Sequence, residues 1–122
     1  MRAVNRQRQI EIAVKMQKAD TFWTRLRGLS GRSGLSTGEA LWITPCHGVH
    51  TWFMRFTIDV IAMNAEGVIV DAVSMLKPWR MRLPKPGAHS VLELPAGTLL
   101  TAPVKVGHHI QIHGWNSAST PA

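Results

Sequence analysis

Hydrophobic and polar residues alternate along much of this chain with the period of two that is typical of β-strands. Residues 8–15 place Ile10, Ile12 and Val14 on one face and polar side chains on the other, which predicts a half-buried strand. Residues 109–113 repeat this pattern, with isoleucine at the two inner positions. Both ends of the chain are therefore expected to contribute strands.

Further apolar runs between turn residues predict strands over 40–43, 58–64, 68–75 and 89–94. The second and third of these runs flank the sequence Asn-Ala-Glu-Gly at 64–67, which is a hairpin signal. The pattern predicts one helix, over about residues 20–28, because Phe22, Leu26 and Leu29 follow helical spacing and two glycines end it. We therefore expect a mainly β protein, a compact antiparallel sandwich or barrel with one short N-terminal helix.

The length of 122 residues fits a single domain. We expect a basic N-terminal extension over 1–9, a β-rich domain over 10–114 and a flexible tail over 115–122. The longest apolar run is four residues, so we expect no membrane-spanning helix, and the polar, cationic start does not resemble a secretory signal. The single cysteine, Cys46, excludes an internal disulfide. These features lead us to expect a cytoplasmic protein.

Basic residues outnumber acidic ones by 14 to 7, which gives a formal net charge of +7. They cluster at the N-terminus and in the acid-free segment that holds Lys77, Arg80, Arg82 and Lys85. Such an excess favours anionic partners. The alternative is a small basic protein that recognises nothing anionic in particular.

Cys46, His47 and His50 are residue types that bind zinc. In an extended segment, however, the two histidines point to opposite faces. We therefore favour a packed thiol and ordinary histidines, keep the metal site as a weak alternative, and expect no metal or other cofactor.

Two carboxylates, Asp59 and Glu93, lie inside apolar, strand-like runs. A carboxylate in such a place either faces outward or lies inside and needs a cation or hydrogen-bond donors, and Arg55 is the nearest candidate for Asp59. Raised pKa values would suit either acid to act as a general base in a hydrolase. A register-fixing ion pair is an equally good interpretation. The sequence contains neither a nucleophile elbow nor a phosphate-binding loop.

Aromatic and cationic residues are mixed at 52–56 and again at 79–82. Exposed rings beside cations can bind single-stranded nucleic acid, although a small β domain also needs tryptophans in its core. The segment 77–87 contains three prolines and a glycine, so we expect it to form an irregular surface loop, and loops of this length are often functional.

Five stretches in order resemble a known family: RLRGLSGR (25–32), HTWFMRFTIDV (50–60), VDAVSMLKPWR (70–80), VLELPAG (91–97) and VGHHIQI (106–112). Together they make the chain similar, over 10–112, to the bacterial and archaeal domain-of-unknown-function family 192. The resemblance implies a compact β-sandwich or barrel with one short N-terminal helix. It supplies no reaction, because the family has no established activity.

The resemblance implies a set of motif residues, and the chain departs from the family's pattern at two places. Thr57 stands where the family commonly has proline, and His108 stands where an acid often follows the glycine. The second departure puts in doubt any role that needs an acid beside the last strand. The implied motif residues are Arg27, Gly28, His50, Thr51, Met54, Arg55, Asp59, Pro78, Trp79, Arg80, Glu93 and Gly97.

The leading hypothesis is a non-catalytic binding or accessory domain that recognises an anionic or peptide ligand, or a partner protein. Two alternatives stay open: a hydrolase that uses Asp59 or Glu93 as general base, and a protein that binds nucleic acid or another polyanion. Both the leading hypothesis and the hydrolase require the His50–Asp59 segment to meet the Trp79 loop. The candidate binding residues are His50, Thr51, Met54, Arg55, Asp59, Trp79, Arg80 and Glu93.

Overall fold

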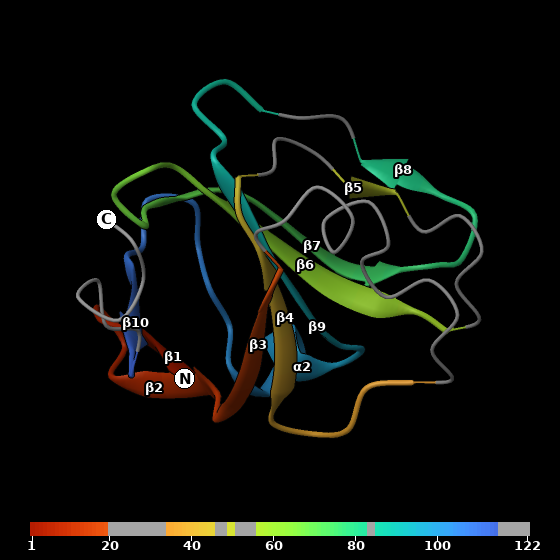
Figure 1. Ribbon diagram of the computed structural model, residues 1–122, viewed down its shortest axis with the longest axis horizontal. Helices are drawn as coiled ribbons and strands as arrows, with labels where there is room; N and C mark the ends of the chain where they lie inside the picture. Colours follow the sequence, from red (N-terminus) through yellow and green to blue (C-terminus); the bar gives the residue numbers. More distant parts are fainter. Residues whose placement is uncertain (20–33, 46–48, 51–55, 83–84, 115–122) are drawn as a thin grey trace.

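The computed structural model describes residues 1–19, 34–45, 49–50, 56–82 and 85–114 (Figure 1). The side chains of Ala19, Val49 and His50 are not described. The expected helix at about 20–28 and the expected tail at 115–122 lie outside the described residues, as do Cys46, His47, Thr51, Met54 and Arg55.

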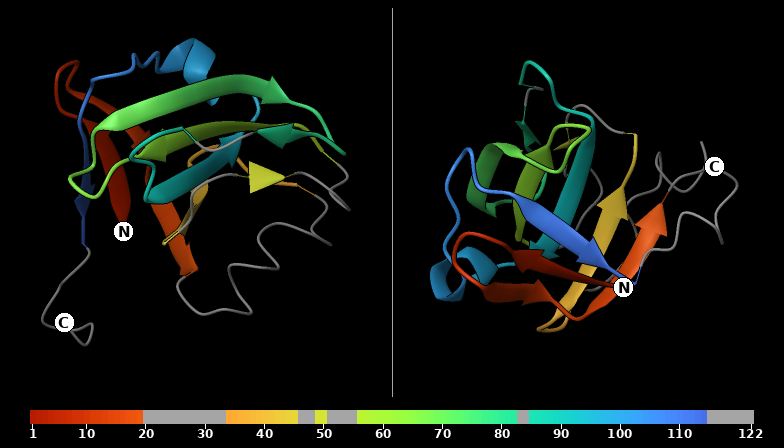
Figure 2. Two further views of the ribbon diagram at one scale, coloured as in Figure 1. Left: turned by 90° about the horizontal axis from the view of Figure 1, so that it is seen from above. Right: turned by 90° about the vertical axis from the view of Figure 1, so that its left-hand side faces the viewer.

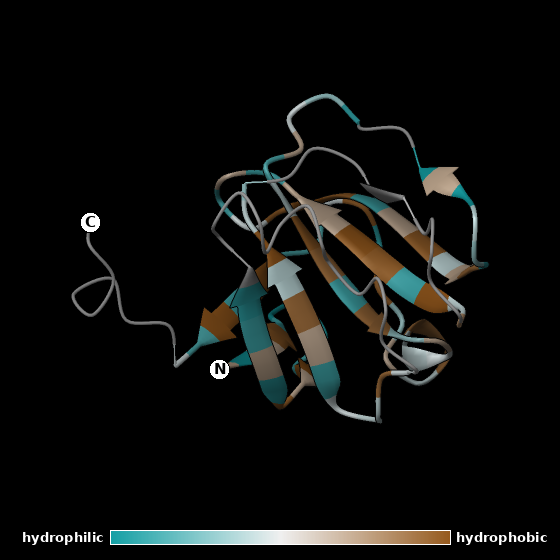
Figure 3. Cartoon of the chain, turned by 45° about the vertical axis from the view of Figure 1, so that its right-hand side comes forward, coloured by the Kyte–Doolittle hydropathy of each residue, from teal (hydrophilic) through white to brown (hydrophobic). Residues whose placement is uncertain are grey.

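The larger sheet has five strands in the order β3 (Lys15–Ala19), β4 (Glu39–Ile43), β9 (Ser90–Pro95), β6 (Ile58–Met63) and β7 (Ile69–Leu76). β3 pairs with β4 in parallel, and the other neighbours pair antiparallel. The runs of branched apolar residues that predicted strands near 40–43, 58–64, 68–75 and 89–94 form β4, β6, β7 and β9. Most residues of these strands are hydrophobic, and polar residues interrupt them at single positions along each strand (Figure 3).

The smaller sheet has three strands in the order β10 (Ile110–His113), β1 (Arg2–Asn5) and β2 (Ile10–Ala13). It lies against one side of the larger sheet (Figure 2). Residues 2–5, which we expected in a basic extension, form its middle strand. The hydrophobic pattern did not predict this strand, because its inward-facing residues, Ala3 and Asn5, are small or polar. The mainly β fold is confirmed, and it is built as a sandwich.

The single strand predicted over 8–15 is wrong, because the chain bends at Val14 and passes from the small sheet to the large one. β2 ends at Ala13 and β3 begins at Lys15. The amides of Val14 and Lys15 both donate to the Gly38 carbonyl at 2.9 Å. Val14 is 56% exposed, whereas its neighbour Ala13 is buried in the core. One chain segment thus serves both layers of the sandwich.

Two hydrophobic clusters line the two faces of the five-stranded sheet. The first cluster lies between the sheets and includes Ile12, Ile61, Leu92 and Ile110. The second cluster lies on the opposite face and is built around Leu41, Ile43, Ile58, Val60, Ala62, Leu76 and Val91. Because successive residues of a strand point to opposite faces, the register of these strands decides which cluster each side chain joins.

The predicted hairpin at 64–67 is confirmed as the link between β6 and β7. The Asn64 Oδ1 atom accepts hydrogen bonds from the amides of Glu66 at 3.0 Å and Val68 at 2.9 Å. Gly67 has φ +86°, and a Cβ there would lie 2.8 Å from the Ile110 carbonyl oxygen. Glycine is therefore required both by the turn and by the close approach of β10.

The helix α2 (Thr98–Thr101) follows β9 and was not predicted. A single turn of four residues is too short to produce a helical period in the sequence. None of the helices in the described part of the chain has the length and apolarity that a membrane crossing needs.

β1 ends at Asn5, whose buried side chain makes hydrogen bonds at both ends. Its Oδ1 atom accepts hydrogen bonds from the amides of Gln7 and Arg8, so the other end of the side chain is the NH2 group. This Nδ2 atom lies 3.0 Å from Nδ1 of His108, and the Lys105 amide donates to the same nitrogen at 3.2 Å. Because two donors face it, His108 Nδ1 carries a lone pair and no proton.

Candidate functional site

Two segments that lie far apart in the sequence pair with each other beside the sandwich. β5 (Val49–His50) and β8 (Met81–Arg82) form a two-stranded antiparallel ribbon, with His50 opposite Met81 and Val49 opposite Arg82 (Figure 1). The expected wholly irregular loop over 77–87 is thus corrected at residues 81–82. These residues lie between prolines and keep their own amides, so they can pair.

The ribbon is attached to the large sheet by an ion pair between Arg82 and Asp71. Arg82 Nε donates to Asp71 Oδ2 and Arg82 Nη2 donates to Asp71 Oδ1, both at 2.8 Å. Asp71 lies opposite Ala62 across β6 and β7, so it projects from the face of the second cluster. The hydrogen bond from the Arg82 guanidinium lowers the pKa of Asp71, although burial opposes this shift. Bidentate geometry of this kind fixes both position and orientation.

The sequence reasoning did not select Asp71 or assign a partner to Arg82. A signal for Asp71 was present, because it is an acid inside a branched apolar run, like Asp59 and Glu93. The signal for its partner was absent, because the separation of 11 positions between Asp71 and Arg82 follows no period of a strand or helix.

Removing the Arg82 charge is expected to loosen the ribbon. Arg82→Gln leaves the nearly buried Asp71 carboxylate without its bidentate partner, and Arg82 is 39% exposed, so we expect a loss of about 1–2 kcal/mol of unfolding free energy. In Arg82→Gln, amides in 77–82 should exchange with deuterium faster than in the wild type, by a larger factor than the amides of β6. Arg80→Gln, on the same segment but exposed, is the control and should change neither quantity. Unchanged exchange in Arg82→Gln would contradict the attachment.

The segment from Met75 to Arg82 exposes large apolar side chains. Met75, Trp79 and Met81 are 52%, 57% and 53% exposed. Met75 and Trp79 also have left-handed backbone conformations, with φ +61° and +62°, which are uncommon for residues with a Cβ. Strained backbone that persists at an exposed position is often associated with function. The candidate residues Trp79 and Arg80 both lie on this segment and both are exposed.

Asp59 is completely buried and fixes the start of this segment. Its Oδ1 atom accepts from the Met75 amide at 2.9 Å, and its Oδ2 atom accepts from the Leu99 amide of α2 at 2.8 Å. The expectation that an inward carboxylate needs donors is met by two backbone amides. With both oxygens held in this way, Asp59 joins β6, the end of β7 and α2.

Glu93 is also buried, and its described neighbours across the sheet are apolar. It is paired with Val60 on one side and Leu41 on the other, so it projects into the second cluster. Burial raises its pKa to about 8. Its Oε1 atom has no hydrogen-bond partner within the described part of the chain. At neutral pH the group is mainly the uncharged acid.

Asp59 and Glu93 lie on opposite faces of the five-stranded sheet. Asp59 pairs with Leu94 of the first cluster, and Glu93 pairs with Val60 of the second. The two acids therefore do not share a cleft, and a hydrolase could use only one of them. Of the other candidates, His50 is placed by its backbone alone, while Thr51, Met54 and Arg55 lie outside the described residues.

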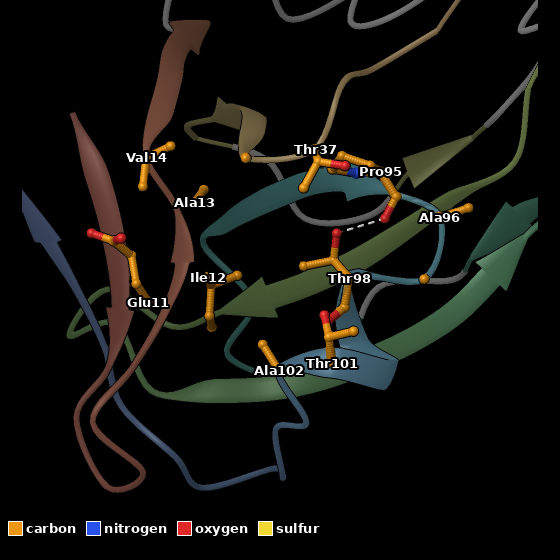
Figure 4. Close-up of a pocket in the computed structure, with 12 residues that line it drawn as sticks. Glu11, Ile12, Ala13, Val14, Thr37, Pro95, Ala96, Thr98, Thr101 and Ala102 are labelled. Atoms are coloured by element: carbon orange, nitrogen blue, oxygen red, sulfur yellow. Dashed lines mark hydrogen bonds between the residues drawn. The ribbon is translucent and has the colours of Figure 1, made fainter.

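The described residues form two hollows at opposite ends of the first cluster, and no candidate residue with a described side chain lines either of them. One, of about 480 Å³, lies between β2 and the end of β9 (Figure 4). Its walls are mostly small apolar residues, and the Thr98 hydroxyl that faces it donates to the Pro95 carbonyl at 2.7 Å. The other, of about 420 Å³, lies at the start of β9, beside the 64–67 hairpin and β10. Across the described ranges, no three His, Cys, Asp or Glu side chains are grouped so that they could hold a metal ion.

The fold defines a small, mainly β protein with two packed sheets and an attached surface ribbon. Residues 3–112 match the model of the DUF192 family, described as "Uncharacterized ACR". The chain belongs to this family, as the ordered motifs indicated.

Curated relatives agree with this assignment. A UPF0127 protein of Pyrococcus furiosus is 34% identical over 111 residues, which cover 87% of this chain and 90% of the relative. A UPF0127 protein of Pyrococcus abyssi is 33% identical over 114 residues, which cover 88% of this chain and 94% of the relative.

Solved structures share the fold at low sequence identity. A protein of unknown function from Novosphingobium aromaticivorans has a TM-score of 0.72 at 16% identity, over 80% of this chain and 74% of its own. A Sinorhizobium meliloti protein described as a "putative transcription regulator" has a TM-score of 0.77 at 16% identity, over 90% of this chain and 89% of its own. At this identity the likeness shows the fold alone.

Proposed function

We propose that this protein is a non-catalytic binding domain whose contact surface is the Met75–Arg82 segment, and that its ligand is an acidic peptide segment of a partner protein. The observation that carries the proposal is that this segment exposes three large apolar side chains while both of its ends are fastened to the sheet. The Asp59 carboxylate holds the Met75 amide at 2.9 Å, and the Asp71 carboxylate holds the Arg82 guanidinium at 2.8 Å.

Fastening at both ends supports binding because it lowers the entropy lost on association. A free loop with exposed methionine and tryptophan would order only in the complex, at a cost in affinity. Tryptophan is enriched among the residues that dominate binding energy, and methionine adapts to varied apolar partners. Trp79 between Met75 and Met81 therefore forms a suitable centre for a peptide contact.

The charge around the segment favours an acidic ligand. No Asp or Glu occurs between Asp71 and Glu93 in the sequence, whereas Lys77, Arg80 and Lys85 are exposed there. Arg82 forms the ion pair with Asp71 that anchors this basic segment. Cations around an apolar centre attract acidic peptides and repel basic ones.

Selection from a phage-displayed library of random short peptides tests this proposal. We expect the enriched peptides to carry Asp or Glu beside an aromatic or aliphatic residue. Trp79→Ala should weaken their binding about tenfold or more, because it removes the central apolar contact. Fluorescence anisotropy of labelled selected peptides measures the effect, and the melting temperature should stay unchanged because Trp79 is exposed.

Val106→Ala is the matched control, because Val106 is also large, apolar and 66% exposed but lies beside the start of β7. It should leave peptide binding unchanged. Enriched peptides without acidic residues, or equal binding by Trp79→Ala, would contradict the proposal. Tighter binding of single-stranded DNA, with an affinity that falls steeply with salt, would replace it with the polyanion function.

A further inference from the structure

The hollow at the start of β9 has the composition of a small-molecule site and lies away from the Met75–Arg82 segment. We propose that it binds a small organic carboxylate with an apolar body. Its lining comes from the ends of β3 and β4, the 64–67 hairpin, the start of β9 and the strand β10. Its volume of about 420 Å³ lies in the range of ligand pockets.

A lysine and a tryptophan form the charged wall of the hollow. Lys18 of β3 lies directly opposite Trp42 of β4, and its Nζ atom is 5.4 Å from the centroid of the Trp42 ring. Both side chains are half-buried. The ring holds the ammonium group at the wall, and partial burial strengthens its attraction for an anion relative to a fully solvated lysine.

The floor of the hollow is apolar and continuous with the first cluster. Met63 and Ile110 are buried there, and Ile112 is half-buried. A ligand whose body covers this floor while its carboxylate meets Lys18 would use both parts of the lining. Ligand pockets combine a mostly apolar lining with a few placed polar groups in this way.

The remaining polar side chains do not oppose an anion strongly. His89 is exposed, and Ser90 and Thr44 supply hydroxyl groups. Glu66 is the one carboxylate among the described residues that line the hollow, and it is exposed at the hairpin turn. Solvent at an exposed position screens its repulsion.

Two isosteric probes, phenylacetate and phenylacetamide, test the charge requirement on the full chain. Both have the same apolar ring, and only phenylacetate carries a negative charge. We expect phenylacetate to bind and to shift the amide NMR signals of residues 64–67 and 109–112. Phenylacetamide should bind about tenfold more weakly, because it lacks the charge-assisted contact with Lys18.

Lys18→Met should weaken phenylacetate about tenfold and leave phenylacetamide unchanged. Lys15→Met is the matched control, because Lys15 lies on the same strand, is exposed and does not line the hollow. Glu66→Gln should strengthen phenylacetate binding slightly. Because the site is separate from the proposed peptide surface, Trp79→Ala should not affect either probe.

Several results would overturn this inference. They are equal affinity for the two probes, phenylacetate shifts confined to 75–82, an unchanged affinity in Lys18→Met, and the absence of binding at millimolar concentration. None of them would contradict the peptide proposal, which depends on Trp79. Failure of the peptide selection would in turn leave the carboxylate site intact.

Discussion

Asp59→Ala is expected to lower the unfolding free energy by about 3–5 kcal/mol, because it removes the buried carboxylate that accepts hydrogen bonds from the amides of Met75 and Leu99. Hydrogen bonds to a charged group contribute roughly 1.5–3 kcal/mol each, and a buried donor left unsatisfied costs a comparable amount. Denaturant titration followed by tryptophan fluorescence measures the loss.

A graded series keeps this prediction testable even if Asp59→Ala does not fold. Asp59→Asn keeps one carbonyl acceptor but turns an NH2 group toward the second amide, so we expect an intermediate loss of about 2 kcal/mol. Glu11→Ala removes an exposed carboxylate that pairs with Arg2 at 3.0 Å, and it should cost less than about 1 kcal/mol. If Asp59→Asn were as stable as the wild type, Asp59 would not be the link between β7 and α2.

The wild type is expected to lose unfolding free energy as pH rises, and Glu93→Gln should remove most of this loss. The unfolded carboxyl has a pKa of 4.5, and burial raises the folded value to about 8. Between these values the folded state binds more protons than the unfolded state, so the unfolding free energy falls with increasing pH. At about 1.4 kcal/mol per pH unit, the loss approaches about 5 kcal/mol above pH 8 as an upper limit.

The comparison of pH profiles isolates this group, since other titrations are shared by the two proteins. Near pH 5 the wild type and Glu93→Gln should be about equally stable, because both present an uncharged group to the second cluster. At pH 9 the variant should be the more stable protein. Glu66→Gln, at an exposed position, should reproduce the wild-type profile. Parallel profiles for the wild type and Glu93→Gln would mean that Glu93 does not hold its proton in the folded state.

The parts of the fold that the sequence predicted are those fixed by local chemistry. The hairpin at 64–67 depends on Asn64 and Gly67, whose turn geometry is a property of these residues alone. The strand β10 alternates because one face packs on the core and the other meets solvent. The buried carboxylates were recognisable as exceptions inside apolar runs.

The parts that were missed depend on contacts between distant segments. Nothing local to Val14 shows that the chain leaves one sheet there, because the bend is held by the Gly38 carbonyl 24 positions away. The ion pair of Asp71 with Arg82 exists only because β8 is brought back over the sheet. Asp59 and Glu93 point to opposite faces because of the register in which β6 pairs with β9. This register cannot be predicted from the sequence of either strand alone.

The double hydrogen bond to His108 Nδ1 shows what this position, where the resemblance implied an acid, requires of its side chain. The Asn5 side chain and the Lys105 amide both donate hydrogen bonds here, so the side chain at position 108 must supply an acceptor lone pair. The acceptor does not have to be negatively charged. A carboxylate of an aspartate would accept the same two protons. Imidazole and carboxylate can thus both supply the acceptor atom that this position requires. With Nδ1 as the acceptor, the imidazole ring carries its single N–H hydrogen on Nε2.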